Sequence, residues 1–355
     1  MLFITKYENG SSTFGGMVRV KDVECITNRS EFLTVNLMEP FHYSFTMNEN
    51  GNKVYNIGVF RFNKVMNVLR EHSGVYFHTV GNFIKLSPYL FVLKSKKKFI
   101  DLHGAQPEEF SYSRKKLRSI LFGYFEKLAF RNCDFFIHVS RKMITHFSDK
   151  YPQHRKENLY VPIFSLNIDV NEKLELQTQA NEARKVLKIF DDKPIFLYSG
   201  GIQAWQKSEL VIDFLTSVLD AGSRVIILSM QKKFFETAFS EYQNDSNLLV
   251  ASVSPAKLST YYLAANYGIM FRDNHVLNEV ASPTKFSEYL FYGMIPLLTS
   301  INVGDFVSLG IDYASPNDFC FNSSNHNKSE KNRQIILQAM QNSQKYKLKE
   351  LLNEQ

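Results

Sequence analysis

Short apolar runs alternate with helical patterns along the first half of the chain. The runs that predict strands occupy residues 2–5, 74–80, 97–104, 133–140 and 157–165. A helical pattern follows the fourth run and extends toward Tyr151. Strands that alternate with helices in this way indicate a parallel sheet with helices on both faces.

The same alternation restarts in the second half. Predicted strands cover residues 194–201, where the strand runs into a glycine turn, and 223–229, 247–253, 266–272 and 294–300. Predicted helices cover residues 210–222, 257–265 and 284–292. We therefore expect an α/β protein made of two doubly wound, Rossmann-like domains, in which ligands bind at the carboxyl ends of the strands.

The domain boundary is expected in the polar stretch 167–193, which has no strand pattern. This places a first domain at 1–170 and a second at 171–330, facing each other across a cleft. A polar helix is predicted over Lys331–Leu352. We expect this C-terminal segment, 331–355, to pack back on the first domain.

Composition narrows the class of protein without selecting a function. The net charge of +7 suits a polyanionic partner, which includes nucleic acid, an anionic membrane surface and phosphorylated substrates. The three cysteines, Cys25, Cys133 and Cys320, are far apart and show no metal-ligand or disulfide spacing, as expected for reduced thiols in the cytoplasm. Apolar runs such as 90–93 are much shorter than the roughly 18 residues that span a bilayer.

The strongest chemical signal is the segment 267–299. A strand ends at Arg272, a loop follows, and a helix is predicted to begin near Ser282–Thr284, since Ser and Thr favour the N-cap and Pro the first turn. Free backbone N–H groups at such a terminus bind phosphate, and Lys285 would add a cation. Glu288 lies about one turn further on, where a carboxylate can accept two hydrogen bonds from a ribose diol.

This segment resembles the nucleotide-sugar site of family 4 glycosyltransferases, which are retaining enzymes of the GT-B architecture. Glu288 matches the second Glu of their Glu-x7-Glu motif, and the resemblance implies that it binds the ribose. The first Glu position holds Val280, with Glu279 one place away. The Ser-Pro-Thr-Lys version resembles a subgroup in polysaccharide biosynthesis that lacks the first Glu, so the contacts to the donor sugar would differ.

Further donor-binding residues are implied at the start of the second domain. Gly200 and Gly201 end a predicted strand, and a turn without side chains lets the backbone approach a pyrophosphate. The family usually has Gly-Arg there, with a Lys a few residues on. Gly201 stands at the Arg position and Lys207 near the Lys position, so Arg272 or Lys285 would supply the missing cation.

Two loops of the first domain resemble other parts of the family's site. His103, in the segment 101–110, corresponds to a His near the donor sugar, and with Lys285 it is a candidate catalytic residue. His78, at the preceding strand end, is a weaker candidate on the acceptor side. Gly15 and Gly16 resemble the family's N-terminal glycine loop, with Gly16 near the donor phosphate and Gly15 on the acceptor side.

The segment 111–130 is basic at its start and apolar afterwards. Arg114, Lys115, Lys116 and Arg118 precede Ile120, Leu121, Tyr124 and Phe125. An amphipathic basic helix can lie on an anionic leaflet. The alternative is a helix packed into the core with a solvated basic end.

The resemblance implies transfer of a sugar from a nucleoside diphosphate, with UDP favoured, to a hydroxyl of a glycan or a polyprenyl-linked acceptor. Retention of configuration and a role in bacterial surface polysaccharide synthesis, such as capsule or O-antigen, are implied too. The nucleotide sugar is a substrate, so no cofactor is expected, and the lack of an Asp-x-Asp motif agrees with a reaction that needs no metal.

Several other functions stay open at the level of sequence. Within enzymes they are a GT-B epimerase and an inverting transferase. A non-catalytic partner subunit that binds the nucleotide sugar is suggested by Val280. A basic α/β nucleic-acid-binding protein is suggested by charge, although the sequence has no recognised nucleic-acid motif, so we expect no nucleic-acid partner.

Overall fold

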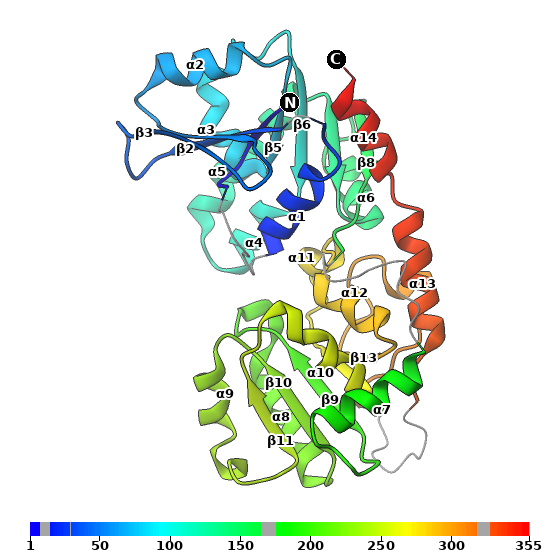
Figure 1. The fold of residues 1–355 in the computed structure, drawn as a ribbon. Coiled ribbons are helices and arrows are strands. Elements are labelled where there is room, and N and C mark those ends of the chain that lie inside the picture. Colours follow the sequence, from blue (N-terminus) through cyan, green and yellow to red (C-terminus); the bar gives the residue numbers. More distant parts are fainter. Residues whose placement is uncertain (8–14, 29, 165–174, 318–326, 355) are drawn as a thin grey trace. The chain divides into compact units, whose positions relative to one another are not determined.

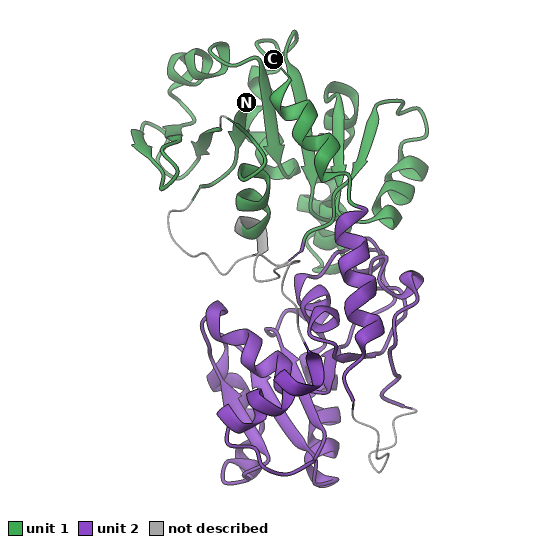
Figure 2. Cartoon of the chain, turned by 45° about the vertical axis from the view of Figure 1, so that its right-hand side comes forward, with its two compact units in different colours: residues 1–163, 343–355 green, residues 164–342 purple. Residues whose placement is uncertain are grey.

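A computed structural model describes residues 1–7, 15–28, 30–164, 175–317 and 327–354. The chain forms two compact units (Figure 2). Unit 1 comprises Met1–Ile163 and Ser343–Gln355, and unit 2 comprises Phe164–Asn342. The two units are described separately below.

Unit 1 is built on an eight-stranded sheet with the order β3-β4-β2-β1-β5-β6-β7-β8. Its strands are β1 Leu2–Ile4, β2 Glu31–Asn36, β3 Tyr43–Met47, β4 Lys53–Gly58, β5 Gly74–His78, β6 Lys97–Leu102, β7 Phe135–His138 and β8 Glu157–Tyr160. All neighbouring strands are parallel except β3, which pairs antiparallel with β4. Strand order reverses at β1, which lies between β2 and β5, so a ligand site is expected beside the carboxyl end of β1.

Helices cover both faces of this sheet (Figure 1). They are α1 Gly15–Glu24, α2 Phe62–Arg70, α3 Val80–Leu86, α4 Gln106–Tyr112, α5 Lys116–Asn132, α6 Arg141–Lys150 and α14 Lys345–Asn353. On one face, Val20 and Val23 of α1 pack with Leu348 of α14 against Phe3 and Tyr76 of the central strands. The C-terminal helix α14 therefore completes the core of unit 1.

Unit 2 has a five-stranded parallel sheet with the order β11-β10-β9-β12-β13. Its strands are β9 Ile195–Ser199, β10 Arg224–Leu228, β11 Leu248–Ala251, β12 Tyr267–Met270 and β13 Ile295–Leu298. Its helices are α7 Leu176–Val186, α8 Ser208–Asp220, α9 Lys232–Ala238, α10 Leu258–Ala264, α11 Val276–Glu279, α12 Thr284–Phe291 and α13 Glu330–Gln341. The chain builds outward from β9 to β11 and then crosses back to β12, so the order reverses between β9 and β12.

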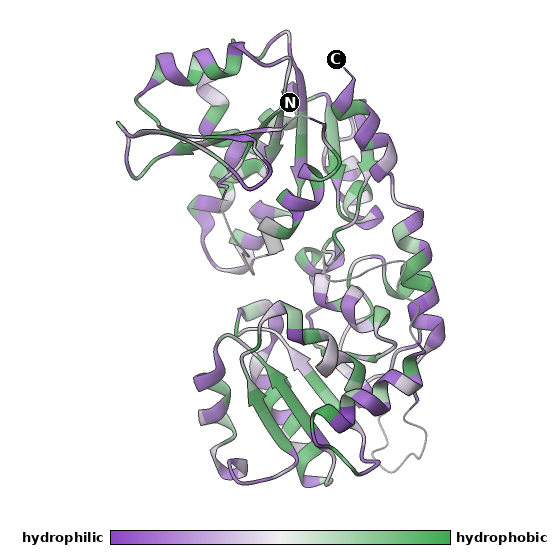
Figure 3. Cartoon of the chain, viewed as in Figure 1, coloured by the Kyte–Doolittle hydropathy of each residue, from purple (hydrophilic) through white to green (hydrophobic). Residues whose placement is uncertain are grey.

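The strands of unit 2 are predominantly apolar, as Figure 3 shows, which is typical of a parallel sheet with both faces covered. Alternate residues enter two cores. Ile195 and Leu197 pack with Tyr289 of α12, whereas Phe196 and Tyr198 pack with Val211 of α8. Gly268 in β12 is required by this packing, because a Cβ there would lie 2.4 Å from the ring of Tyr289. The ring thus lies directly on the strand backbone.

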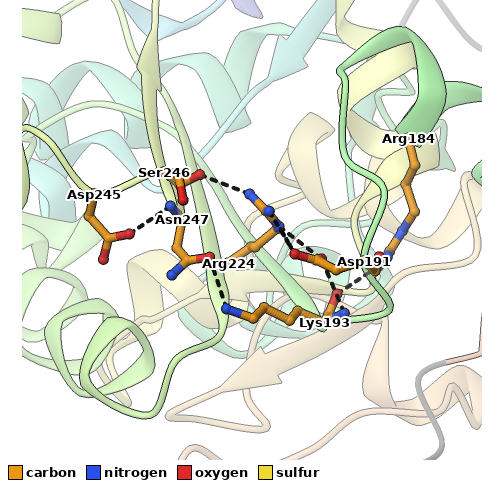
Figure 4. A network of polar contacts seen from close by, with 7 residues as sticks. All are labelled: Arg184, Asp191, Lys193, Arg224, Asp245, Ser246 and Asn247. Atoms are coloured by element: carbon orange, nitrogen blue, oxygen red, sulfur yellow. Dashed lines mark hydrogen bonds and ion pairs between the residues drawn. The ribbon is translucent and has the colours of Figure 1, made fainter.

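The amino ends of the unit 2 strands are joined by a polar network (Figure 4). The guanidinium of Arg224 donates three hydrogen bonds to the Asp191 carboxylate, at 2.7, 3.0 and 3.2 Å, and a fourth to the carbonyl of Ser246 at 2.8 Å. Lys193 donates to Asn247 at 3.2 Å. These bonds link the segments that enter β9, β10 and β11 at the amino edge of the sheet.

Short 3-10 turns complete the described structure, at Ser87–Tyr89, Ala204–Gln206, Ser240–Tyr242, Pro255–Lys257 and Val307–Leu309. No helix among the described ranges is both long and apolar enough to cross a membrane.

The predicted α/β architecture with two doubly wound sheets is confirmed. Two details of the prediction were wrong. The segment predicted as one helix, 331–352, forms α13 in unit 2 and α14 in unit 1, with a break around Ser343. Gly15 and Gly16 begin helix α1 and are not part of a loop, whereas residues 11–14 of the predicted glycine loop lie outside the described part of the chain.

Candidate functional site

Helix α12 begins beside the carboxyl end of β9, next to the point where the strand order of unit 2 reverses. Its first residue is Thr284, as the sequence predicted, but the N-cap is Pro283. Pro283 makes no side-chain cap bond, and the Thr284 carbonyl accepts a hydrogen bond from Ser287 at 2.7 Å. The Phe286 N–H donates to the Pro283 carbonyl at 3.0 Å. The N–H groups at the start of a helix lack the usual partner four residues before them, so such a terminus can bind a phosphate.

Glu288 connects α12 to the end of β9. Its side chain is 4% exposed, and its Oε2 accepts a hydrogen bond of 3.0 Å from the Tyr262 hydroxyl of α10. The Tyr262 hydroxyl also contacts Ser199 Oγ at 2.9 Å. Because a carboxylate only accepts, Tyr262 donates to Glu288 and accepts from Ser199. Burial, with Glu288 adding to it, holds the pKa of Tyr262 well above its ordinary value, so this hydroxyl remains a donor.

A second tyrosine, Tyr289 of α12, also binds the carboxyl end of β9. The backbone N–H of Ser199 donates to the Tyr289 hydroxyl at 2.9 Å, and Tyr289 is fully buried. Burial raises the pKa of Tyr289 far above its usual value. The position of Glu288 relative to the last residue of β9 is therefore set by two tyrosines, one on α10 and one on α12.

Lys285 lies one turn before Glu288 and pairs with it. Its Nζ is 3.1 Å from Glu288 Oε2 and 5.8 Å from the centre of the Tyr262 ring. The Lys285 side chain is still 35% exposed. It can therefore reach a ligand at the start of α12 while its charge compensates the nearly buried carboxylate.

The glycine turn after β9 is closed by hydrogen bonds. The Tyr198 hydroxyl donates to the Gly201 carbonyl at 2.6 Å, and the Gly201 N–H donates to Gln206 Oε1 at 2.6 Å. A Cβ on Gly200 would lie 2.7 Å from the Tyr198 hydroxyl, so only glycine fits there. The turn is a rigid, side-chain-free end of the central strand.

The two remaining predicted cations lie near each other after β9 and β12. Lys207 precedes α8 in the left-handed region, with φ of 51°, and its Nζ is 2.7 Å from Asp273 Oδ2. Arg272 donates to the Trp205 carbonyl at 3.0 Å. Burial lowers the pKa of Arg272. Both cations are thus held at the carboxyl edge by protein groups.

Val280 occupies the position of the first Glu in the resembled motif. It directly follows the short helix α11 and is 1% exposed, whereas Glu279 is partly exposed. The adjoining chain is fixed by Asn278, which donates to the Asp273 carbonyl at 3.0 Å and accepts from the Gly304 N–H at 3.1 Å. The position therefore holds a buried apolar side chain on a fixed segment of the chain.

In unit 1, a buried ionic cluster lies at the carboxyl ends of β5 and β6. Asp101 is fully buried and accepts from Arg19 of α1 at 2.7 and 3.2 Å and from the Tyr76 hydroxyl at 2.7 Å. Burial alone would raise the pKa of Asp101, but Arg19 and His103 together hold it far below its usual range. The carboxylate is therefore charged at any physiological pH.

The two predicted histidines border this carboxylate. His103 Nε2 is 3.5 Å from Asp101 Oδ2, and its side chain is 18% exposed. His78 Nδ1 is 3.7 Å from the same oxygen, but His78 is only 1% exposed and stacks on Phe3. The exposed edge of His103 is available to a ligand, whereas burial of His78 argues against the predicted contact with an acceptor.

These three residues are also the group, within the described ranges, whose ligand atoms are close enough to hold a metal ion. The donor set fits a cation poorly. Asp101 already accepts from Arg19 and Tyr76, and the Arg19 charge would repel a divalent ion. The hydrogen bonds of Asp101 with Arg19 and Tyr76 instead tie α1, β5 and β6 together.

The burial of His78 predicts a loss of stability in mild acid. Burial lowers its pKa to about 3, while the unfolded chain binds a proton near pH 6.5. A depressed pKa contributes stability above the unfolded value that is lost as the pH falls toward the folded value. Between pH 7.5 and 5, His78 should therefore cost about 2 kcal/mol of the unfolding free energy, measured by urea denaturation.

The variant His78→Phe should reduce that pH dependence, because no proton is taken up at the position after unfolding. His42→Gln is the matched control, since it removes a partly exposed imidazole from the same unit. An equal pH dependence in wild type and His78→Phe would contradict the assignment.

The residues that sequence analysis missed are the positioning groups: Tyr262, Tyr289, Ser199, Arg19, Asp101 and Tyr76. Tyr262 and Ser199 are 63 positions apart, and Arg19 and Asp101 are 82 apart. A strand-end polar residue was the available signal for Asp101, which stands two places before His103. The others carry no local motif.

No protein-family model and no curated protein sequence matches the chain. Solved structures match its fold almost end to end. Sucrose-phosphate synthase from Thermosynechococcus elongatus matches with a TM-score of 0.63 at 13% identity, over 99% of this chain and 93% of that chain. Starch synthase IV from Arabidopsis thaliana, bound to ADP and acarbose, matches with a TM-score of 0.63 at 11% identity, over 99% and 97%.

WaaG, a glycosyltransferase involved in lipopolysaccharide biosynthesis, matches with a TM-score of 0.59 at 13% identity, over 99% of this chain and 92% of that chain. Identities this low establish the fold alone. The neighbours are GT-B glycosyltransferases with two Rossmann-like domains, so the chain has the GT-B fold.

Proposed function

We propose that the chain is a glycosyltransferase that transfers a sugar, a hexose in our proposal, from a nucleoside diphosphate sugar to an acceptor hydroxyl. The observation that carries the proposal is the arrangement of Glu288, Lys285 and the open first turn of α12 at the carboxyl end of β9. The carboxylate suits a ribose diol, and the helix terminus with Lys285 suits a diphosphate.

In the proposed reaction, the bond from the anomeric carbon to the β-phosphate oxygen breaks and a bond to the acceptor oxygen forms. Negative charge develops on the departing diphosphate, where the α12 N–H groups and Lys285 would stabilise it without a metal ion. The acceptor proton passes to the leaving phosphate when attack occurs on the same face, which retains the configuration. UDP is the proposed nucleotide.

A panel of nucleotides and nucleotide sugars tests the proposal directly. UDP or a UDP-sugar should raise the melting temperature of the protein, since binding to the folded state alone stabilises it by mass action. Hydrolysis or transfer should release UDP when acceptor is present. A melting temperature that no nucleoside diphosphate changes, even at millimolar concentration, would refute the proposed donor site.

His103→Ala should lower turnover by more than it lowers nucleotide affinity. His103 lies in unit 1, after β6, whereas the proposed nucleotide contacts belong to unit 2. Loss of one hydrogen bond made in the transition state, worth about 1.4–2.8 kcal/mol, costs about 10- to 100-fold in kcat. The measurement compares kcat with UDP affinity in the same preparation, and wild-type kcat would leave His103 with a structural role alone.

The proposed acceptor is a glycan or a polyprenyl-linked sugar, at the cytoplasmic face of the membrane in bacterial surface polysaccharide synthesis. Helix α5 supports this location. Leu117, Ile120 and Tyr124 are 84, 71 and 64% exposed, and with Leu121 they form a stripe at helical spacing. The exposed cations Arg114, Lys115, Lys116 and Arg118 lie at its start. An apolar stripe with a basic end suits an anionic bilayer surface.

Ile120→Glu should therefore weaken binding to vesicles that contain phosphatidylglycerol by at least about tenfold, because it removes an apolar contact and adds a negative charge. Val186→Glu, on α7 of unit 2, is the matched control, since Val186 is 71% exposed outside the stripe. Vesicle cosedimentation measures both. Equal binding of the Ile120→Glu variant and wild type would exclude α5 as the contact.

A nucleotide-binding partner subunit without its own activity is the second candidate, and the buried Val280 favours it. Such a protein would give the same rise in melting temperature with UDP. It would release no UDP from any UDP-sugar in the presence of acceptor, so the turnover measurement separates the two functions.

A further inference from the structure

Strand β3 forms an open edge of the unit 1 sheet. The N–H of Gly58 donates to the carbonyl of His42, and the N–H of Asn48 donates to that of Asn52. In an antiparallel pair, hydrogen-bonded positions alternate along the strand, so the even positions of β3 bond to β4. The backbone groups of Tyr43, Phe45 and Met47 therefore point outward. Within the described ranges, no backbone hydrogen bond from outside the β3–β4 pair reaches them.

The side chains on this edge are apolar and exposed. Tyr43, Phe45 and Met47 are 44, 46 and 52% exposed, and β3 contains no charged residue and no proline. Soluble proteins commonly protect an edge strand with lysine, proline or a bulge, because unpaired N–H and C=O groups are a template for another strand. None of these devices is present in the five residues of β3.

The edge is also held in place. Glu24, at the end of α1, accepts hydrogen bonds from the side chains of Asn48, Asn50 and Asn52 at 2.7, 3.1 and 2.9 Å. These three residues form the turn between β3 and β4. The hairpin is therefore tied to the body of unit 1, and a partner strand would meet an ordered template at little entropic cost.

We propose that a second copy of this chain pairs with β3 in antiparallel orientation, with the two-fold axis passing through Phe45. In this register Phe45 lies opposite its own counterpart, and Tyr43 lies opposite Met47 of the other copy. The outward N–H and C=O groups of both strands then meet in hydrogen-bonded pairs, and none is left over within the segment.

A second copy suits this edge because the edge is complementary to itself. The outward positions are symmetric about Phe45, and the five residues of the strand carry no charge. Lys64 Nζ lies 5.3 Å from the centre of the Tyr43 ring, so the positive charge beside the strand is at its ends and not at the axis. The strand is only five residues long, which limits the buried area. We therefore expect a weak dimer whose population rises with protein concentration.

Charge variants at Phe45 test both the surface and the axis. Phe45→Lys alone and Phe45→Glu alone should each be monomeric, because each places two like charges opposite one another. An equimolar mixture should form a heterodimer, because lysine then lies opposite glutamate. Sedimentation velocity over a hundredfold range of concentration measures the species, and circular dichroism checks that each variant is folded.

Thr46→Lys is the matched control, since its backbone bonds to β4 and its exposed side chain lies on the other face of the strand. It should keep more of the dimer than Phe45→Lys. A wild-type protein that stays monomeric throughout the range would overturn the proposal. So would a dimer that Phe45→Lys leaves intact, since another surface would then form it, or one that the mixture fails to restore.

Discussion

Glu288→Ala should reduce affinity for UDP by about 30- to 150-fold, because two hydrogen bonds from the ribose diol to a charged acceptor are together worth roughly 2–3 kcal/mol. The effect is large because the carboxylate is held ready by Tyr262 and balanced by Lys285 before the ligand arrives. Isothermal titration of UDP measures it. Turnover should fall at least as much, since donor binding precedes transfer.

Two variants test whether a loss of UDP affinity reflects the missing ribose contact or a change in the folded structure. Glu288→Gln keeps an oxygen that accepts from Tyr262 but removes the charge, so it should be folded and bind UDP more tightly than the Ala variant. Tyr262→Phe leaves the carboxylate in place without its buried donor. Unchanged UDP affinity in a folded Glu288→Ala protein would rule out the proposed ribose role of Glu288.

The sequence pattern was sufficient for the parts of the fold that repeat regularly. Continuous apolar runs such as 194–199 and 223–229 lie buried as β9 and β10, since both faces of a parallel sheet are covered. The strands β2, β3 and β4, of which β3 is the edge strand, were missed because their sequences mix polar and apolar positions. The break between α13 and α14 was missed because Ser343 and its neighbours carry no Pro or Gly.

In the candidate site, too, some residues could be predicted from local sequence and others could not. Glu288 and Lys285 could be predicted because they share one helix with a strand end before it, so local spacing placed them. Their partners could not be predicted, because Tyr262 reaches Glu288 from another helix, 26 positions away. The pairing of Lys207 with Asp273, 66 positions away, is likewise a tertiary contact. Lys285 and Glu288, by contrast, form an i,i+3 pair on one helix, which local spacing allows.

The two edges of the unit 2 sheet differ in the polar groups that they carry. At the amino edge, Arg224 and Asp191 bind each other and the chain around them. At the carboxyl edge, the N–H groups of Gly200 and Gly201 donate to the Leu228 carbonyl and to Gln206 Oε1, and Lys285 pairs with Glu288 within α12.

Asp101→Ala should destabilise the protein by about 3–5 kcal/mol, because it leaves the fully buried guanidinium of Arg19 without its partner and the Tyr76 hydroxyl without its acceptor. The depressed pKa of Asp101 means that its contribution is present in full above the unfolded value near 4 and is lost only as the pH falls below that value. Urea denaturation at pH 7 therefore measures the whole effect.

The double variant Arg19→Met with Asp101→Leu should recover much of the loss, because replacing a buried ion pair by apolar residues removes both desolvation costs at once. Lys232→Ala is the matched control for an exposed pair, since Lys232 and Glu236 are both nearly half exposed, and it should cost less than about 1 kcal/mol. If Asp101→Ala were no more costly than this control, the cluster could not be holding β6 and α1 together, and His103 would have to be positioned by other groups.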